Sequence, residues 1–352
     1  MSMIHIIFFV VFSLIGANCL QCVDETNNNV DWYVLYKIPR ENHYNKLIKN
    51  GEAYLYMSSN SMGSWKLSNL SVNSSLSFLG NSLKPLYNTK KNKQLLHILY
   101  NDEPPTKHPN LKKGHTKGIV VADKQGGFWI VHSIPLFPPP SDNSYLYPHT
   151  GMHFGQSALC ISFNAKIMNK IGVQLIFNEP QIYSSNIPTD LVSIYPKLND
   201  VINHKKISNA PSFHKSKLNS LLGKGFLSFA KNKQFNKDLY SDWVAPNLKV
   251  GMYAETWLNG PGKLISDCNK SYSVNNVRGI KLEMINLKFK SSSDHSKWAV
   301  ANNSGSNWIC IGDINRAEHQ LHRGGGTVCV NDKRISAAYR NSINSVEPCF
   351  ML

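Results

Sequence analysis

The sequence predicts an α/β fold made of two related halves, each with a mixed β-sheet flanked by helices. The chain has 352 residues, which suffices for one large domain or two ordinary ones. Its hydrophobic content of 42% supports a packed core and excludes disorder over most of the chain. A His-x-Lys pair followed by two strands recurs at matched positions in both halves, as a duplicated unit would produce. Helices are expected at 164–171 and 332–343.

The N-terminal segment has the pattern of a secretory signal peptide. Residues 4–16 form an apolar run, and the small and polar residues that follow suit a cleavage site near residues 17–21. The run is too short for a comfortable membrane span, and no later stretch is long enough for one. We therefore expect residues 1–20 to be a signal peptide and the protein to be secreted or lysosomal. A buried N-terminal strand is the alternative interpretation.

The cysteines and the glycosylation sequons fit an oxidising secretory route. Of the seven cysteines, Cys19 falls within the expected leader, and an even number remains, as an oxidising compartment favours. These six allow 15 disulfide pairings, and beyond the leader none forms the C-x-x-C motif of a zinc ribbon. Sequons predict surface glycosylation at Asn69, Asn73, Asn269 and Asn302.

The charge balance points to an acidic partner. The net charge is +16 with histidine neutral. The first 23 residues contain no Lys, Arg, Asp or Glu, so removal of the leader would leave this charge unchanged. A strongly basic secreted protein is expected to meet a polyanion, such as nucleic acid, a heparin-like glycan or an acidic membrane. The alternative is that lysine serves only to keep the surface soluble.

The first half is predicted to be rich in strands. Residues 31–38 and 95–100 are apolar runs typical of buried strands, and the breaker N-D-E-P-P follows the second run. His115-Thr-Lys117 ends the polar loop that comes next. An apolar run over 118–122, a D-K-Q-G-G turn and a second apolar run over 128–133 then predict a β-hairpin.

The second half repeats this layout. His295-Ser-Lys297 precedes short apolar runs over 298–301 and 308–313, and it lies 180 residues after its counterpart. We therefore expect an N-terminal half at 21–190 and a C-terminal half at 191–352, and a pseudo-twofold axis would bring the two pairs into one pocket.

The His-x-Lys motif carries weight only through this context, because a random sequence of the same composition would contain such a pair by chance. A third pair, His204-Lys-Lys206, shows the point. It lies in a polar stretch and has no hairpin after it, so it is interpreted as solvated surface.

Two His-x-Lys pairs around one point suit the hydrolysis of a phosphodiester. Residues i and i+2 of a strand point the same way, so each His and its Lys can address one ligand. One neutral histidine would attack phosphorus to form a phosphohistidine, and the other, protonated, would give a proton to the leaving oxygen. Lys117 and Lys297 would hold the non-bridging oxygens in place of a metal ion. By this chemistry alone His115 and His295 are interchangeable, and neither metal nor cofactor is required.

Nearby polar residues are candidates for tuning the histidines and for contacting the substrate. Three carboxylates could fix a tautomer and raise one pKa, or simply occupy turns and the surface. These are Asp123, Asp294 and Asp313. His132, at the far end of the first hairpin, is a candidate substrate contact, with a structural histidine as the alternative. Asp313, Asn315 and Gly312 follow the second hairpin and could complete a phosphate-binding cradle. The R-G-G-G-T run at 323–327 could present backbone N–H groups to phosphate or form a tight turn.

Several longer stretches make the chain resemble the deoxyribonuclease II family, acid endonucleases related to phospholipase D. The resemblance covers nearly the whole chain. It includes V-D-W-Y-V-L-Y-K-I-P at 30–39, G-H-T-K-G-I-V-V-A-D-K-Q-G-G-F-W-I-V-H-S at 114–133, D-H-S-K-W at 294–298 and W-I-C-I-G-D-I-N-R at 308–316. It implies a phospholipase D-like pseudo-dimer that cleaves double-stranded DNA at acid pH without a divalent metal. The products would carry 3′-phosphate and 5′-hydroxyl ends, and the setting would be lysosomal or secreted.

The resemblance also implies roles for individual residues. His295 would be the nucleophile and His115 its acid and base partner. Lys117 and Lys297 would contact the phosphate. The disulfides of the family would join Cys22 to Cys160, Cys268 to Cys349 and Cys310 to Cys329.

Two positions of the second hairpin differ from what the family pattern would lead one to expect. Ala299 stands where relatives often carry a further cysteine, which leaves an even cysteine count. Asn302 places a sequon inside the catalytic hairpin, where a glycan could crowd the DNA cleft.

Two other functions are compatible with the same fold. A catalytically silent, secreted DNA-binding or host-interacting protein would keep the fold without turnover, although the two intact His-x-Lys pairs argue against it. A lipid phosphodiesterase is also possible for the fold, but the high positive charge and the polar loops favour DNA. Nothing here resembles a base-reading helix, so little sequence preference is expected. The sequence does not indicate the oligomeric state.

Overall fold

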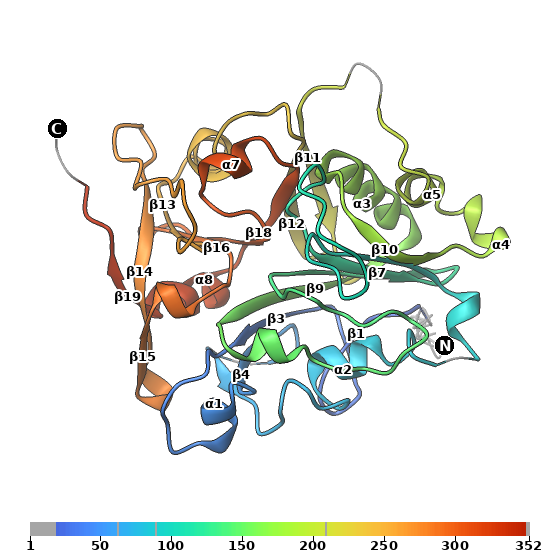
Figure 1. Ribbon diagram of the computed structural model, residues 1–352, viewed down its shortest axis with the longest axis horizontal. Coiled ribbons are helices and arrows are strands. Elements are labelled where there is room, and N and C mark those ends of the chain that lie inside the picture. The colour runs from blue at the N-terminus through green and yellow to red at the C-terminus, as the bar shows by residue number, and fades with distance from the viewer. Residues whose placement is uncertain (1–18, 62, 89, 208–209, 350–352) are drawn as a thin grey trace, which may run out of the picture.

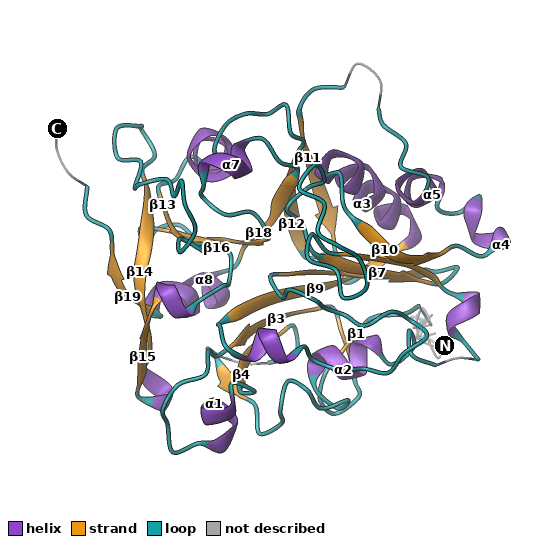
Figure 2. Ribbon diagram, viewed as in Figure 1, coloured by secondary structure: helices purple, strands orange, loops and turns teal. Residues whose placement is uncertain are grey.

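The computed structural model describes residues 19–61, 63–88, 90–207 and 210–349. Within these ranges the chain forms two large β-sheets with helices packed between and around them, which confirms the predicted α/β class (Figures 1 and 2). Residues 1–18, the greater part of the expected signal peptide, lie outside the described residues. No helix in the described ranges has both the length and the apolar character that a membrane span requires.

The first sheet has eight strands, and each neighbouring pair among them is antiparallel. Side chains alternate between its two faces, as extended backbone requires. Trp129 and Val131 enter one apolar cluster, whereas Phe128 and Ile130 enter another. In order across the sheet the strands are β10 (Ile182–Asn186), β6 (Leu96–Tyr100), β7 (Gly118–Ala122), β8 (Gly126–His132), β9 (Gln156–Asn164), β3 (Trp32–Lys37), β4 (Tyr54–Ser58) and β5 (Lys66–Leu67). A separate small sheet pairs β1 (Cys22–Val23) with β2 (Asn29–Val30).

The second sheet has nine strands and is mixed, because β13 and β14 run parallel. Its side chains also alternate between two apolar clusters: Trp298 and Val300 face one, Ala299 and Ala301 the other. In order across the sheet the strands are β11 (Phe213–Asn219), β12 (Gly225–Lys231), β18 (Gly325–Asn331), β17 (Trp308–Gly312), β16 (Trp298–Ala301), β13 (Met252–Glu255), β14 (Val274–Leu282) and β15 (Leu287–Lys290), with β19 (Ile343–Val346) paired to β14.

The two sheets share one strand order. The first contains β6-β7-β8-β9-β3 and the second contains β13-β16-β17-β18-β12, and the strands of each series follow the same sequence along the chain. The predicted hairpins are the pairs β7–β8 and β16–β17, so the structure confirms both. Each series ends in a helix, which is α3 (Ala165–Asn178) after β9 and α8 (Lys333–Asn341) after β18.

Helix α3 is longer than the sequence pattern suggested. The predicted helix stopped at Ile171, but the observed helix continues through Gly172 to Asn178. Gly172 is needed because a Cβ there would lie 2.6 Å from the backbone carbon of Lys197 in α5 (Pro196–Ile202). The glycine therefore permits close helix packing and does not end the helix. The remaining helices are α1 (Lys46–Asn50), α2 (Phe78–Leu83), α4 (Thr189–Val192), α6 (Ala245–Leu248) and α7 (Glu318–Leu321).

A single apolar core joins the two sheets. One buried cluster contains residues of β3, β7 and β8 together with residues of β16, β17 and β18, and helices α3 and α8 contribute to it as well. Polar contacts cross the same junction. The carboxylate of Asp31, just before β3, accepts hydrogen bonds from the Ser220 hydroxyl at 2.5 Å and from the Leu222 N–H at 2.8 Å. The Tyr36 hydroxyl donates to the carboxylate of Asp294.

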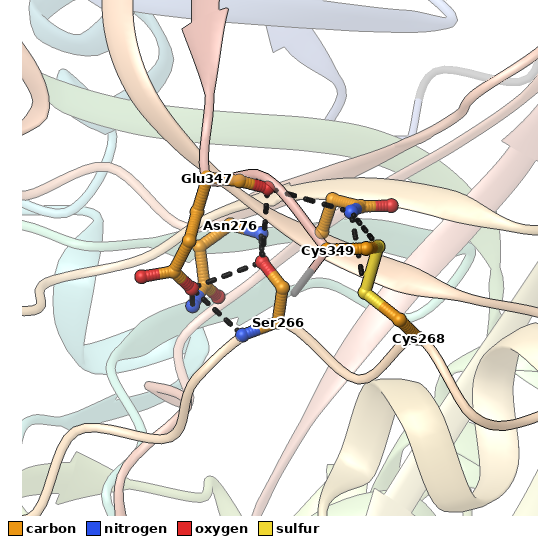
Figure 3. Close-up of a disulfide and its surroundings, with 6 residues drawn as sticks. Ser266, Cys268, Asn276, Glu347 and Cys349 are labelled. Carbon is orange, nitrogen blue, oxygen red and sulfur yellow. Dashed lines mark hydrogen bonds between the residues drawn. A yellow bond between two sulfur atoms is a disulfide. The ribbon is translucent and has the colours of Figure 1, made fainter. Parts of the chain in front are cut away.

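The disulfides are those that the family resemblance implied. Cys22 joins Cys160, Cys268 joins Cys349 and Cys310 joins Cys329. Figure 3 shows the second of these beside Glu347, whose carboxylate accepts hydrogen bonds from Ser266 and Asn276. This cluster fastens the chain that follows β19 to the second sheet. Cys19, which the sequence placed in the leader, is a buried free thiol in the full chain.

We predict that Asp31→Ala lowers the free energy of unfolding by about 1–3 kcal/mol, because the buried hydroxyl of Ser220 and the N–H of Leu222 lose their acceptor. Urea denaturation at neutral pH measures the change. The matched control is Asp142→Ala, which removes an exposed carboxylate and should leave the unfolding midpoint almost unchanged. Equal unfolding midpoints for the two variants would contradict the assigned role of Asp31.

Candidate active site

The histidines of the two His-x-Lys pairs meet at one cavity of about 420 Å3 between the sheets. Both histidines line it, and the lining comes from both halves of the chain. The lining residues that matter most for the chemistry are Asp102, His115, Trp257, His295, Asn315 and Arg323. The sequence predicted that the two pairs would share one pocket, and the structure places both imidazoles there.

Each histidine is tied to the backbone of the other half. The N–H of His115, just before β7, donates to the carbonyl of Gly324 at 2.8 Å, and the N–H of His295, just before β16, donates to the carbonyl of Gly155 at 2.8 Å. Gly155 precedes β9 and Gly324 precedes β18, which occupy equivalent places in the two sheets. At the cavity, the residue that carries each imidazole is therefore hydrogen-bonded to the residue just before a strand of the other sheet.

The imidazole rings repeat this reciprocal pattern. Nδ1 of His115 lies 2.6 Å from the carbonyl oxygen of Asp313, and Nδ1 of His295 lies 3.0 Å from that of Ser133. A carbonyl oxygen only accepts hydrogen bonds, so both rings carry their proton on Nδ1. Nε2 of each ring is thereby left with a free lone pair in the neutral form. Gln156 adds a second acceptor to Nδ1 of His295 at 3.2 Å.

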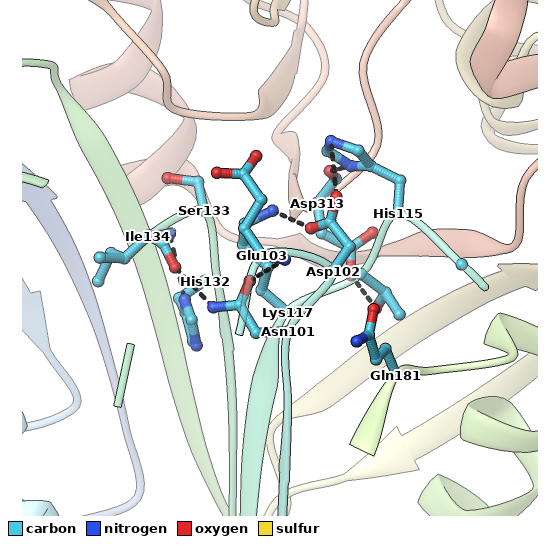
Figure 4. Close-up of polar contacts among 12 residues, drawn as sticks. Asn101, Asp102, Glu103, His115, Lys117, His132, Ser133, Ile134, Gln181 and Asp313 are labelled. Carbon is cyan, nitrogen blue, oxygen red and sulfur yellow. Dashed lines mark hydrogen bonds and ion pairs between the residues drawn. The ribbon is translucent and has the colours of Figure 1, made fainter. Parts of the chain in front are cut away.

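One carboxylate distinguishes the first histidine from the second. Asp102, directly after β6, forms an ion pair with the ammonium of Lys117 (Figure 4). Its other oxygen lies 3.6 Å from Nε2 of His115 and 3.6 Å from the guanidinium of Arg323. Burial alone would raise the pKa of Asp102, but His115, Lys117 and Arg323 hold it below its ordinary value. Sequence reasoning missed this residue because N-D-E-P-P was interpreted only as a strand breaker.

The equivalent position in the second half is a tryptophan. Tyr100 pairs with Gly118 and Glu255 pairs with Trp298, so the residues two places beyond each strand, Asp102 and Trp257, correspond. The Trp257 ring lies 5.1 Å from the His295 ring and nearly perpendicular to it. In the described chain no carboxylate lies within ion-pair distance of His295, in contrast to His115.

Burial and charge act on the two imidazoles in different ways. Burial lowers the pKa of His115 well below its ordinary value. The carboxylate of Asp102 opposes that shift, whereas the nearby cations Lys117, Arg323 and Lys297 add to it. Burial also lowers the pKa of His295, and the nearby ammonium groups of Lys297 and Lys117 lower it further. His115 is therefore the ring whose protonated form has a stabilising partner.

The two lysines lie behind the histidines and do not line the cavity. Lys117 and Lys297 are almost completely buried. Nζ of Lys297 donates to the carbonyl of His295 at 2.6 Å, and burial lowers the pKa of Lys297 well below its ordinary value. The sequence predicted that both lysines would contact the phosphate directly, but in the structure neither Lys117 nor Lys297 lines the cavity. The cationic side chains that do line the cavity are those of Arg323 and the exposed Lys263.

Asn315 and Asp313 lie beside His115, as candidates for the site should. Nδ2 of Asn315 is 3.5 Å from Nε2 of His115. The carboxylate of Asp313 accepts hydrogen bonds from the Thr116 hydroxyl and, at 3.0 Å, from the N–H of Gly326, and burial raises its pKa to about 6. Asp313 therefore positions His115 and does not face the substrate. The glycine run serves the same purpose, since Gly324 and Gly326 hold His115 and Asp313.

His132 is not brought to the cavity. Alternation along β8 turns its ring to the opposite face from Trp129 and Val131, where it packs edge-on against Phe137. The ring is fully buried, Nδ1 accepts the N–H of Ile134 at 3.1 Å, and burial lowers the pKa of His132 to about 3. This placement fits the alternative interpretation from the sequence, in which His132 is a structural histidine.

Three other candidates lie away from the imidazoles. Asp123 accepts hydrogen bonds within the turn between β7 and β8, at the opposite end of the hairpin from His115. Asp294 is bonded to Tyr36 and to the N–H of Ser296 and touches neither ring. Asn302 follows β16 at the end of that strand remote from Lys297. The described residues contain no group of three or more His, Cys, Asp or Glu arranged to hold a metal ion.

Comparison with known proteins identifies the family of this chain. The family model for Deoxyribonuclease II matches residues 21–349. The chain is 37% identical to Plancitoxin-1 of Acanthaster planci over 336 residues, which are 95% of this chain and 93% of that protein. It is 37% identical to Deoxyribonuclease-2-alpha of Mus musculus over 340 residues, 95% of each chain, and 34% identical to Deoxyribonuclease-2-beta of Homo sapiens over 348 residues, 98% of this chain and 96% of that one. This chain belongs to the deoxyribonuclease II family.

Proposed function

We propose that the protein is an endonuclease that hydrolyses the phosphodiesters of double-stranded DNA in an acidic compartment. The reaction uses a phosphohistidine intermediate and no divalent metal, and it leaves 3′-phosphate ends. The observation that carries the proposal is the pair of imidazoles, each anchored through Nδ1 to a carbonyl of the other half, that share one cavity. Family membership and the net charge of +16 support DNA as the substrate.

In the first step Nε2 of His295 attacks the phosphorus atom, and the bond from phosphorus to the 5′ oxygen breaks. Nε2 of His115, protonated, gives its proton to that oxygen, which leaves as a 5′-hydroxyl. In the second step water attacks the phosphohistidine while His115 takes a proton from it. The bond from phosphorus to His295 breaks, and a 3′-phosphate is released.

The difference between Asp102 and Trp257 supports this assignment of roles. Asp102 stabilises the imidazolium of His115, which the acid of the first step needs. His295 has no carboxylate within ion-pair distance in the described chain, and the ammonium groups of Lys297 and Lys117 lower its pKa, which favours the neutral nucleophile. Arg323, Lys263 and Asn315 line the cavity and would donate hydrogen bonds to the non-bridging oxygens. Lys117 and Lys297, which are buried and do not line the cavity, add positive potential that favours the charge developing in the transition state.

We also propose that the two sheets are the halves of a phospholipase D-like pseudo-dimer, with the boundary near residue 190. The repeated strand order and the reciprocal bonds at the cavity support this relation. Passage through the secretory route to a lysosomal or secreted location is proposed on the leader pattern and the three disulfides. Glycan attachment at Asn69, Asn73, Asn269 or Asn302 belongs to the same proposal.

We predict that the purified protein cuts supercoiled plasmid at pH 5 in excess EDTA and is much slower at pH 7.5. The acid step requires protonated His115, and burial lowers its pKa, so the active form is lost as the pH rises. The conversion of supercoiled to nicked and linear plasmid on a gel measures both rates. Cleavage that needs added magnesium would overturn the mechanism. DNA retention without cleavage under any condition would favour the catalytically silent alternative.

We predict that Asp102→Asn shifts the alkaline limb of the kcat/KM profile to lower pH by about one unit or more. Asp102 raises the pKa of His115, so His115 loses its proton at lower pH when the carboxylate is removed, and the uncompensated Lys117 acts in the same direction. Glu103→Gln is the matched control, because Glu103 lines the same cavity and makes no ion pair with His115. An alkaline limb that stays in place, or that moves no further than in the control, would refute the role of Asp102.

A further inference from the structure

A second pocket, of about 230 Å3, lies on the surface next to the active site and is lined by lysines from separate segments. Lys112 and Lys113 come from the loop before β7, Lys206 follows α5 and Lys233 follows β12. Figure 1 shows that loop in teal, running near β11 and β12. We call this pocket, whose lining also includes a fifth lysine, Lys205, the lysine pocket. The residues of the His204-Lys-Lys206 motif line this pocket and do not line the active-site cavity.

The lysine pocket is not explained by ion pairing within the protein. In the part of the chain that the structure describes, none of these four ammonium groups lies within 4.0 Å of a carboxylate oxygen, whereas that of Lys205 pairs with Asp200 at 2.9 Å. Lys112, Lys206 and Lys233 are exposed. Glu179 is the only acidic residue in the described lining. Like charges gathered in a hollow repel one another, so the arrangement suits an anion that comes from solution.

One residue joins the lysine pocket to the cavity. Arg323 lines the cavity, and its guanidinium donates to the carbonyl of Lys113 at 3.0 Å and to that of Gly114 at 3.2 Å. His115 follows Lys113 by two residues, a backbone distance of at most about 7 Å. A strand of DNA whose phosphodiester sits at His115 would therefore carry its neighbouring phosphates toward the lysines.

We infer that the lysine pocket binds backbone phosphates of the same duplex, a few nucleotides to one side of the bond that is cut. The inference rests on the proposed function. Lysine ammonium groups on flexible stems make point contacts with phosphate and carry no sequence information. Each phosphate that they neutralise releases counterions, which strengthens binding and makes it depend on salt. The pocket would thus extend the substrate site beyond the cavity and hold the duplex in register.

The test compares Lys206→Gln/Lys233→Gln with the control Lys91→Gln/Lys93→Gln, which removes the same charge before β6, at the opposite end of that strand from Asp102. Neither test residue belongs to the loop that carries His115. Cleavage of a 30-base-pair duplex is measured at several salt concentrations. For the test pair we expect KM to rise several-fold at unchanged kcat, and the slope of log KM against log salt to fall by about 1–2. A duplex too short to reach the pocket should show no difference in KM.

The outcomes separate this inference from the proposed function. A test pair that matches the control in KM and in salt slope, while the unmodified protein cuts DNA, overturns the lysine pocket as a DNA site. Loss of kcat on the short duplex also overturns it, because it shows damage to the active site. If the unmodified protein cuts no DNA, the proposed function fails. DNA retention by the test and control double variants then still decides whether the lysine pocket binds the duplex. Competition with heparin shows whether the pocket prefers another polyanion.

Discussion

The site depends on a reciprocal exchange of backbone hydrogen bonds between the two sheets. His115 is anchored to the carbonyls of Gly324 and Asp313, and His295 to those of Gly155 and Ser133. Each histidine thus takes its position and its tautomer from the opposite half of the chain. Neither half contains a complete site, so the cavity exists only while the shared apolar core keeps the sheets in register.

Because both imidazoles are anchored through Nδ1 to a backbone carbonyl, this anchoring does not distinguish them. The difference between them comes from the neighbouring side chains. Asp102 and Trp257 occupy equivalent places beyond the strands β6 and β13. A carboxylate in the first place and an aromatic ring in the second allow one ring to hold a proton while the other stays neutral. The buried lysines reinforce the arrangement, since Lys117 is compensated by Asp102 and Lys297 is not ion-paired in the described chain. Under the proposed mechanism, this one difference would decide which histidine is the acid and which is the nucleophile.

Much of the fold could be predicted from the sequence, because short apolar runs and turn residues mark β7, β8, β16 and β17 directly. The cavity followed from the recurrence of His-x-Lys. Other features depend on tertiary packing that no local pattern reveals. The predicted helix over 164–171 stopped before Gly172, whose contact with α5 depends on residues elsewhere in the chain. His132 looked like a site residue because the face that its strand presents to the cavity was unknown. Asp102 was hidden in a turn motif, and the disulfide pairing came from family resemblance alone.

The most direct test of this account is to trap the covalent intermediate and locate it. DNA with 32P in its phosphodiesters is mixed with excess protein at acid pH, and the reaction is quenched in alkali, where phosphohistidine survives. The labelled peptide is then identified by mass spectrometry. The account predicts transient label on the peptide that contains His295, and none in His295→Asn. Label on the peptide that contains His115, or full cleavage with no labelled protein at any time, would contradict it.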